Sequence, residues 1–566
     1  MKRANFDTTR ELFSLLAAGG VRDVVISPGA RSAPLAFAAE GTARLRTHVT
    51  IDERVGSFFA LGLARSTGSP TVFVCTSGSA GAHALPAILE SRYGGGPLVV
   101  ITADRPGELW DCGASQTVRQ ARYFGEHALS FSIETPHEEG PTVHLRTLVA
   151  QVLTEALRQP VHLNVPLREP LKQDAPRREA PSHVEVLRGK VAPSIEALET
   201  VERRIEGRRG VIVVGPAHEG RLGPAAHRLA AALSWPVIAE PASGGSLGFA
   251  GPRLVSSAAA FLPSPAVARQ LRPEVIVRLG RPPTANAVSQ WLERAGADVI
   301  VFEAGARYLD PQHSAKLVIE GDPERSCDWL AGRVRSIDES WLRAFRRVDD
   351  SVRAVLDEAA ATGFWEGTIA RELLRRMPSS WALHVGNSSP IRDLELFGGP
   401  GTSTRRVLSS RGVCGIDGGI ATALGEARGL EAPVVAYLGE LAVQHDAGAL
   451  LAMRQLGGDV MILMVDNGGG GIFRTLPFAS ESDPTFQRLC LTPSSMDVEA
   501  LCRAGGVAYS RATREEELAS AIARASFPSL VHVIVNGSAS HGARVRALAE
   551  AGRAAARSLD LEGEIP

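Results

Sequence analysis

The sequence predicts an α/β protein made of three doubly wound parallel-sheet domains. Short apolar runs alternate with helical stretches along most of the 566 residues, a pattern typical of parallel sheets with helices on both faces. The apolar runs end at polar or glycine-containing turns, as buried strands do. At about 150 residues per domain, the length allows three or four such units. We place the three domains at residues 1–180, 190–345 and 360–566.

The first domain shows the alternation most clearly. Strands are expected at residues 23–27, 71–76 and 97–102, because each is short, apolar and ended by a turn. Helices are expected at residues 53–65 and 80–91. The stretch 168–194 is rich in Pro, Lys, Arg and Glu, which is typical of a linker.

The second and third domains repeat the pattern. Strands of the second domain are expected at residues 210–215, 236–239, 274–278 and 298–302. A charged helical segment at 338–361 leads into the third domain. Strands of the third domain are expected at residues 382–385, 434–438, 460–465 and 530–535. Ligands of such sheets bind outside the carboxyl ends of the strands, so functional residues are expected just after these runs.

The composition excludes several classes of protein. Lys and Arg total 61 against 62 Asp and Glu, a formal net charge of −1, which gives no sign of a nucleic-acid or membrane-surface partner. The six cysteines form no CxxC pair, so zinc spacing is absent and a reducing compartment is favoured. No apolar run approaches the ~18 residues that span a bilayer. We therefore expect a cytoplasmic protein without an integral membrane segment.

Oxygen-bearing side chains follow two neighbouring predicted strands of the third domain. Glu440 comes directly after the run at 434–438, and Asn467 follows the run at 460–465 and precedes four glycines. Carboxylate and amide oxygens at adjacent strand ends can hold one hard cation, and Mg²⁺ usually keeps substrate phosphates and water in its shell. Glycines let backbone approach a ligand closely. An acidic turn next to a glycine-rich hairpin is the ordinary structural explanation, but the pairing of the two is more specific.

This pairing resembles the metal motif of thiamine-diphosphate enzymes, in which Gly-Asp is followed by an Asn-containing end. The resemblance implies thiamine diphosphate and Mg²⁺ as cofactors, with Mn²⁺ possible, and makes Glu440, Asn467 and the Gly469 carbonyl the metal ligands. Glu53 follows a strand and opens a helix, where the helix dipole favours an acid in any protein. The resemblance implies that Glu53 is the buried glutamate of the family. That glutamate hydrogen-bonds the aminopyrimidine of the cofactor and controls the protons of the cofactor.

Further motifs narrow the resemblance. In the first third of the chain they are Ser27-Pro28-Gly29-Ala30-Arg31-Ser32, Asp52-Glu53-Arg54, Cys75-Thr76-Ser77-Gly78-Ser79-Ala80, Thr102-Ala103-Asp104-Arg105-Pro106 and Gly113-Ala114-Ser115-Gln116. In the last third they are Gly386-Asn387-Ser388-Ser389-Pro390-Ile391-Arg392, Ser410-Arg411-Gly412, Gly415-Ile416-Asp417-Gly418, Gly470-Gly471-Ile472-Phe473 and Leu476-Pro477. In this order they resemble the MenD family of menaquinone biosynthesis, over nearly the whole chain and most weakly in the middle domain.

The resemblance implies a reaction and a set of residues. The family decarboxylates 2-oxoglutarate on thiamine diphosphate and joins the remaining four-carbon unit to isochorismate by 1,4-addition, giving 2-succinyl-5-enolpyruvyl-6-hydroxy-3-cyclohexene-1-carboxylate. Both substrates are anionic, and arginine pairs with carboxylate through two hydrogen bonds. The implied catalytic residues are Glu53, Arg31, Arg392, Arg411 and Ser388, of which Arg392, Arg411 and Ser388 hold 2-oxoglutarate. The implied substrate contacts are Arg105, Gln116, Ser115, Asn286 and Phe473, and the implied cofactor contacts are Glu53, Ser77, Gly78, Asn387, Ile416, Gly439 and Ile472.

Three positions depart from the family pattern. Glu440 stands where aspartate is expected, and Ser115 stands where asparagine is usual before Gln116. In the middle domain, Asn286 replaces a lysine that would help to bind isochorismate, and a neutral amide cannot replace its charge.

Other functions are also compatible with parts of the sequence. Gly244-Gly245-Ser246-Leu247-Gly248 fits the G-x-S-x-G elbow of serine hydrolases, but that elbow requires a following helix, and Phe249-Ala250-Gly251-Pro252 is poor helix material. A related thiamine carboligase with another acceptor, or a degenerate homologue that only binds a ligand, stays open. In the family the cofactor lies between the first domain of one subunit and the third of another, which implies a homodimer or homotetramer.

Overall fold

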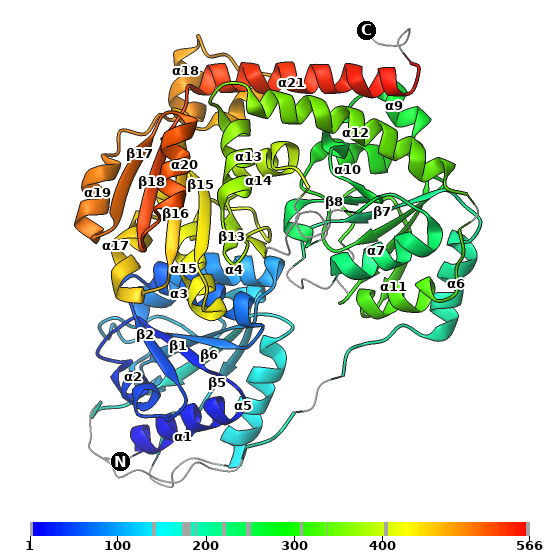
Figure 1. Ribbon diagram of the computed structural model, residues 1–566. Helices are drawn as coiled ribbons and strands as arrows, with labels where there is room; N and C mark the ends of the chain where they lie inside the picture. Colours follow the sequence, from blue (N-terminus) through cyan, green and yellow to red (C-terminus); the bar gives the residue numbers. More distant parts are fainter. Residues whose placement is uncertain are drawn as a thin grey trace.

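The computed structural model describes residues 4–137, 143–171, 183–186, 189–217, 222–244, 251–305, 309–336, 338–400 and 406–561. It contains three six-stranded sheets (Figure 1). Every recorded strand pair is parallel, and helices flank the sheets. The predicted fold class is therefore confirmed. The sheets lie inside the ranges 1–180, 190–345 and 360–566, whose limits as domains stay a prediction.

The first sheet has the strand order β2-β1-β3-β4-β6-β5. Its strands are β1 (Asp23–Ile26), β2 (Arg46–Val49), β3 (Thr71–Cys75), β4 (Leu98–Asp104), β5 (Leu129–Ser132) and β6 (Val161–Pro166). Its helices are α1 (Ala4–Ala18), α2 (Ala33–Glu40), α3 (Glu53–Thr67), α4 (Leu85–Gly94) and α5 (Val143–Ala156), with 3₁₀ turns η1 (Gly78–Ala84), η2 (Gly107–Leu109) and η3 (Gly125–His127). The single helix expected at 80–91 is wrong in its first half, because α4 begins only at Leu85, next to a proline in its first turn.

The second sheet has the order β12-β11-β10-β7-β8-β9. Its strands are β7 (Gly210–Val214), β8 (Val237–Ala239), β9 (Leu254–Val255), β10 (Val275–Leu279), β11 (Asp298–Glu303) and β12 (Ala315–Glu320). Its helices are α6 (Ile195–Ile205), α7 (Leu222–Leu233), α8 (Ala258–Phe261), α9 (Pro265–Gln270), α10 (Asn286–Arg294) and α11 (Pro323–Ala331), with the 3₁₀ turn η4 (Pro241–Ser243). Residues 172–182 and 187–188 of the expected linker, and Ser246 of the hydrolase-like motif, lie outside the described residues.

The third sheet has the order β14-β13-β15-β16-β18-β17. Its strands are β13 (Ala382–Val385), β14 (Val407–Ser409), β15 (Val434–Gly439), β16 (Val460–Asp466), β17 (Ala508–Ala512) and β18 (Ser529–Ile534). Its helices are α12 (Ser340–Ala361), α13 (Glu366–Arg376), α14 (Ser389–Phe397), α15 (Gly419–Leu430), α16 (Glu440–His445), α17 (Ala447–Leu456), α18 (Pro484–Phe486), α19 (Val498–Gly505), α20 (Glu515–Ala523) and α21 (Gly537–Ser558), with short turns η5 (Gly471–Thr475) and η6 (Gln487–Leu491).

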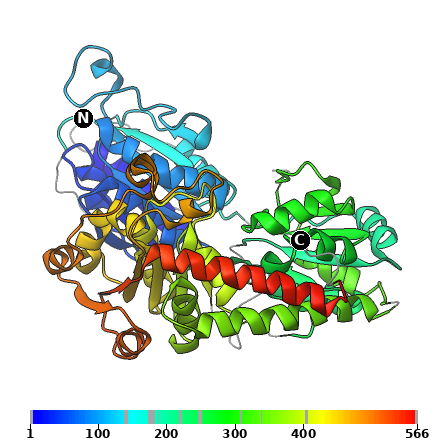
Figure 2. The same cartoon turned by 90° about the horizontal axis from the view of Figure 1, so that it is seen from above.

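Helix pairs join the three parts. Helix α3 packs along α15, and glycines allow this close approach, since a Cβ on Gly62 would overlap the carbonyl of Thr422 and one on Gly425 would overlap that of Phe59. The first and third sheets thereby share one core. The long helices α12 and α21 lie along each other and reach from the third sheet to the second, as Figures 1 and 2 show.

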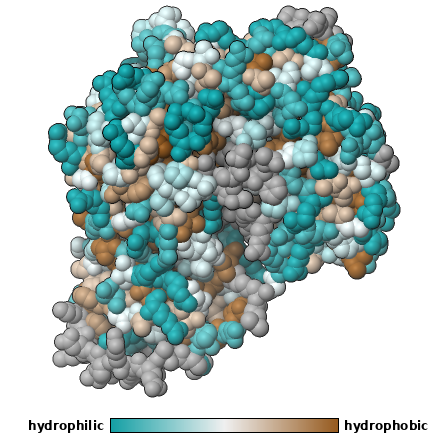
Figure 3. All heavy atoms as spheres, viewed as in Figure 1, coloured by the Kyte–Doolittle hydropathy of each residue, from teal (hydrophilic) through white to brown (hydrophobic). Residues whose placement is uncertain are grey.

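The surface in the orientation of Figure 1 is mostly hydrophilic, with apolar residues in small separate patches (Figure 3). Among the described helices, none combines the length and the apolar character needed to cross a membrane. The described cysteines at 75, 112, 327, 414, 490 and 502 are all free thiols.

Candidate active site

Glu440 and Asn467 lie at the carboxyl ends of the adjacent strands β15 and β16. Glu440 opens α16 and is 3% exposed, and its Oε1 accepts a hydrogen bond of 2.6 Å from the Gly469 amide. Burial raises the pKa of Glu440 to about 8, although the hydrogen bond from Gly469 lowers it. Within the described residues no cation pairs with this carboxylate. An ionised carboxylate buried in this way needs a positive partner.

The orientation of the Asn467 amide supports the same conclusion. Its Nδ2 donates to Glu366 Oε1 at 2.6 Å, which turns Oδ1 the other way. Oδ1 is buried and has no hydrogen-bond partner among the described residues. A buried acceptor without a partner costs about 1–3 kcal/mol, and a cation would remove that cost. The two oxygens of Glu440 and Asn467 therefore fit a hard metal ion.

The glycine-rich turn after β16 is shaped by close packing. Gly468 and Gly469 have φ of +79° and +131°, which only glycine adopts readily. A Cβ on Gly469 would also overlap the Leu491 carbonyl. The Gly469 carbonyl, a predicted metal ligand, accepts from the Gly471 amide at 2.8 Å, so a metal would use its second lone pair. No group of three His, Cys, Asp or Glu side chains in the described part of the chain is arranged for a metal, so any ion here must take amide, carbonyl or external ligands.

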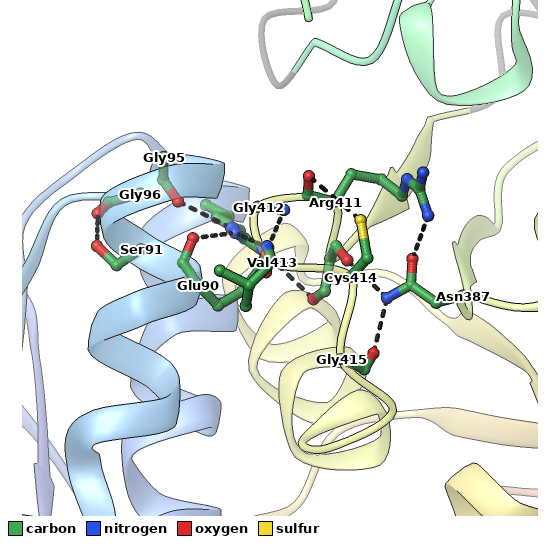
Figure 4. Close-up of polar contacts among 12 residues, drawn as sticks. Glu90, Ser91, Gly95, Gly96, Asn387, Arg411, Gly412, Val413, Cys414 and Gly415 are labelled. Carbon is green, nitrogen blue, oxygen red and sulfur yellow. Dashed lines mark hydrogen bonds and ion pairs between the residues drawn. The ribbon is translucent and has the colours of Figure 1, made fainter. Parts of the chain in front are cut away.

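A second group of predicted residues lies at the end of β13 and in the loop after β14. Asn387 Nδ2 donates to the carbonyls of Ser410 at 2.8 Å and Gly415 at 2.7 Å, and its Oδ1 accepts from Arg411 Nη1 at 2.7 Å (Figure 4). Arg392 Nη1 donates to the Ser388 carbonyl at 2.6 Å. Ser388 has φ +71° and ψ −130°, a conformation that a non-glycine residue rarely adopts and that clusters at functional sites. The structure therefore brings Asn387, Ser388, Arg392 and Arg411 together.

Burial and the charge of the neighbouring Arg411 act on Arg392. Burial lowers the pKa of Arg392, and the positive charge of Arg411 lowers it further. Both arginines act on Glu240 of the middle sheet, whose pKa burial raises to about 7. Glu240 Oε1 accepts from the Thr284 amide at 3.3 Å, and Oε2 is buried without a partner among the described residues. The middle domain thus contributes a carboxylate to an arginine-rich site of the third domain.

A third group gathers at the carboxyl ends of the first sheet. Arg105 Nη1 donates to Ser77 Oγ and, at 2.8 Å, to the Gln116 carbonyl. Gln116 Nε2 donates back to the Ser77 carbonyl at 3.0 Å, and its side chain lies against Gly78. Arg31 donates to the Leu167 carbonyl at 2.9 Å, and its Nε is buried without a partner in the described part of the chain. This group presents two guanidinium groups at one strand edge.

The buried carboxylate of Asp104 lies near these two charges, and Arg31 Nη2 also pairs with Glu169 Oε1 at 3.3 Å. Asp104 is fully buried at the end of β4, between the amide of Asn164 at 2.9 Å and the backbone of Arg105. Burial raises its pKa, while Asn164, Arg105 and Arg31 lower it. Ser115, next to Gln116, is exposed.

Glu53 occupies the first position of α3, with Asp52 as the N-cap. In the single chain Glu53 is only half-buried and its neighbour Ile51 is 82% exposed, so the burial of Glu53 against the cofactor stays a prediction. Its carboxylate makes no hydrogen bond or ion pair within the described residues. Ile416 is likewise 41% exposed and Phe473 38% exposed.

Three regions of the chain match known protein families. Residues 6–123 match the thiamine pyrophosphate enzyme, N-terminal TPP binding domain. Residues 189–385 match the middle domain of thiamine pyrophosphate enzymes, and residues 400–534 match their C-terminal TPP binding domain. A relative from Myxococcus xanthus, named 2-succinyl-5-enolpyruvyl-6-hydroxy-3-cyclohexene-1-carboxylate synthase, is 40% identical over 538 residues, which cover 91% of each chain. The chain belongs to this synthase family.

Further members of the synthase family also match most of the length of the chain. A relative of the same name from Chloroflexus aurantiacus is 37% identical and covers 92% of this chain and 91% of its own. One from Haloarcula marismortui is 36% identical, with 86% and 87% covered. The predicted family is therefore confirmed, and the chain is an enzyme of the thiamine-diphosphate-dependent class.

The synthase-family residues form separate hydrogen-bonded groups in the chain. No hydrogen bond or ion pair of the described residues joins the Arg31–Arg105 group to the Arg392–Arg411 group. Asn286 opens α10 and is exposed, two positions after the buried Thr284. Gly439 ends β15 directly before Glu440, and a Cβ there would meet nothing within 4 Å, so space is open beside it. Ile472 lies half-buried in η5.

Two residues of the site were missed by sequence reasoning. Glu240 directly follows β8, so its place after a strand could have marked it. Glu366 precedes Asn467 by about a hundred positions and carries no motif, so only the folded structure shows that it holds the Asn467 amide.

Proposed function

We propose that this chain catalyses the thiamine-diphosphate-dependent decarboxylation of 2-oxoglutarate and the 1,4-addition of the remaining four-carbon unit to isochorismate, giving 2-succinyl-5-enolpyruvyl-6-hydroxy-3-cyclohexene-1-carboxylate. The observation that carries the proposal is the hydrogen-bonded group of Arg392, Arg411, Asn387 and Ser388, which offers two guanidinium groups to a dicarboxylate in the same sheet domain as the metal-type pair of Glu440 and Asn467. The relatives that cover this chain carry the name of that activity.

We propose that Mg²⁺, or Mn²⁺ in its place, is held by Glu440, Asn467 and the Gly469 carbonyl. The buried carboxylate without a cation and the buried amide oxygen without a partner support this proposal. Hard oxygen ligands of this kind suit Mg²⁺, which takes its remaining ligands from diphosphate and water. Thiamine diphosphate, when bound, serves as the electron sink of the decarboxylation.

The side chains of the protein then position reactants and move protons. Arg392 and Arg411 pair with the donor carboxylates, and Ser388 supports them from its strained turn. Arg31, Arg105 and Gln116, with Ser115 and Asn286 at the rim, face the acceptor. Glu53 holds and releases a proton at the aminopyrimidine ring. Ser77, Gly78, Asn387, Gly439, Ile416 and Ile472 form the walls of the cofactor site, and Phe473 borders the reacting centre.

We further propose a homodimer or homotetramer in which each active site combines the first domain of one copy with the third domain of another. The exposure of Ile51, beside Glu53, and of the proposed site residues Ile416 and Phe473 supports this, because ligand sites normally enclose most of the ligand. Light scattering at several protein concentrations tests it, and a fully active monomer would contradict it. The cytoplasmic location and the independence from nucleic acid stay predictions.

The decisive experiment is an incubation with 2-oxoglutarate, isochorismate, thiamine diphosphate and Mg²⁺, followed by mass spectrometry. The proposal expects release of CO₂ and a product that contains both carbon skeletons. Parallel reactions replace 2-oxoglutarate by pyruvate or omit isochorismate. Product from pyruvate alone would indicate a different carboligase, and the absence of any decarboxylation would indicate a homologue that only binds ligands.

A further inference from the structure

A buried ion pair lies between two helices of the first domain. Arg65 near the end of α3 and Glu90 on α4 have side chains only 1% and 3% exposed, and Arg65 Nη2 meets Glu90 Oε1 at 2.6 Å. Arg65 Nε also donates to the Gly95 carbonyl at 3.0 Å. Ion pairs this deep contribute little net stability compared with apolar residues of the same size, so another reason for this pair is needed.

The oxygen and nitrogen atoms of this pair also form hydrogen bonds with the loop at residues 410–413 of the third domain. Glu90 Oε1 accepts from the Gly412 amide and Oε2 from the Val413 amide, both at 2.9 Å. Arg65 Nη1 donates to Ser410 Oγ at 3.1 Å. Figure 4 shows Glu90 reaching from its helix to the loop that carries Arg411. If the loop withdrew, a buried carboxylate would lose two donors, which is costly.

The same loop is held from its other side by Asn387. This residue bonds the carbonyls of Ser410 and Gly415, at the two ends of the loop, and accepts from Arg411 Nη1. Gly412 packs closely against α4. A Cβ on Gly412 would lie 2.7 Å from the Glu90 carbonyl oxygen and would also overlap the Gly94 backbone. Arg411 therefore extends from a segment clamped between two domains.

We propose that Arg65 and Glu90 are positioning residues that set the place of the Arg411 guanidinium and so determine affinity for the carboxylate of the donor substrate. The inference rests on the proposed donor role of Arg411. Two-pronged pairing of guanidinium with carboxylate depends on position. A displacement of 1 Å from a change far from the chemistry can cost about 10²-fold.

The primary test is Glu90→Gln, which keeps the size of the side chain but offers one acceptor oxygen to two amides. We expect the KM for 2-oxoglutarate to rise about tenfold or more, with a smaller change in kcat. The KM for isochorismate and the Mg²⁺ requirement should stay at the wild-type values. A matched control is Asp23→Asn on β1. Asp23 is also buried and ion-paired, with Arg46 and His48. This variant should melt earlier without any change in donor KM.

A double-mutant cycle separates the two proposals. If Glu90 acts through Arg411, the effect of Glu90→Gln should vanish in the Arg411→Ala background. Unchanged donor kinetics in Arg411→Ala alone would refute the donor role itself. An impaired Arg411→Ala beside a folded Glu90→Gln with wild-type donor KM would refute only the positioning role.

Should Glu90→Gln fail to fold, Gly412→Ala and Ser410→Ala disturb the same clamp while both charges remain. Gly412→Ala should raise the donor KM more than Ser410→Ala, because it displaces the backbone and Ser410→Ala removes one hydrogen bond. Wild-type donor KM in both folded variants would overturn the proposal.

Discussion

The proposed metal site makes the sharpest prediction, because Glu440 has one oxygen for the Gly469 amide and a second for the proposed cation. Its Oε1 accepts from the Gly469 amide at 2.6 Å, which leaves Oε2 for a cation. Glu440→Ala removes a charge-assisted contact of about 2–5 kcal/mol, so Mg²⁺ binding should weaken about 30-fold to several thousand-fold. Glu440→Gln keeps one oxygen but no charge, and it should fall between wild type and Glu440→Ala.

The assay is a titration of the enzyme with Mg²⁺ in the presence of thiamine diphosphate, followed by calorimetry and by turnover. Glu440→Asp serves as the family-like control, since its side chain is one methylene shorter than that of Glu440. Mg²⁺ demands oxygen distances of about 2.0–2.1 Å, so we also expect Mn²⁺ and Ca²⁺, with longer distances, to replace it readily in the wild type. If Glu440→Ala needs no more metal than wild type, Glu440 is not a ligand and the reasoning fails.

Five further substitutions test the rest of the site and the stability of the fold. Glu53→Gln should lower turnover about 10²–10⁴-fold, as expected for a lost proton-transfer group, with an unchanged melting temperature; near-normal turnover would exclude that role. Arg392→Ala and Arg411→Ala should each reduce kcat/KM for 2-oxoglutarate by an amount on the order of 2–5 kcal/mol, measured by steady-state kinetics, and unaltered donor kinetics in both would refute the donor site. Asn286→Lys should lower the KM for isochorismate, and no change would mean that another residue serves or that the acceptor differs. Burial lowers the pKa of His162 from 6.5 to about 4, so the unfolded chain binds more protons between these values and stability falls as pH falls through this window, by about 2 kcal/mol at pH 5. The melting temperature of His162→Gln should therefore fall less than that of the wild type between pH 7 and pH 5. An equal fall in both proteins would show that the buried His162 is not the cause.

Most of the central strands could be predicted because they are buried on both faces, although β6, which is equally buried, was missed. β13 begins and ends where the sequence predicts, and β3, β15 and β16 differ by one residue at their ends. Edge strands such as β2 and β17 were missed, because half of each is open to solvent and their sequences carry few apolar residues. The pattern of burial, which creates the sequence signal, is weak at the edge of a sheet.

The sequence by itself determined the fold class, the family and the chemical types of the site residues, because strand periodicity and the residues after each strand are local properties. Which residues hold these side chains in place was decided only by the tertiary structure. Glu90 and Gly412 are joined by one hydrogen bond across more than three hundred positions, and Glu366 and Asn467 across about a hundred. No local pattern records such a contact, since packing of separate helices and sheets, and not the neighbouring residues, determines where each buried charge finds its partner.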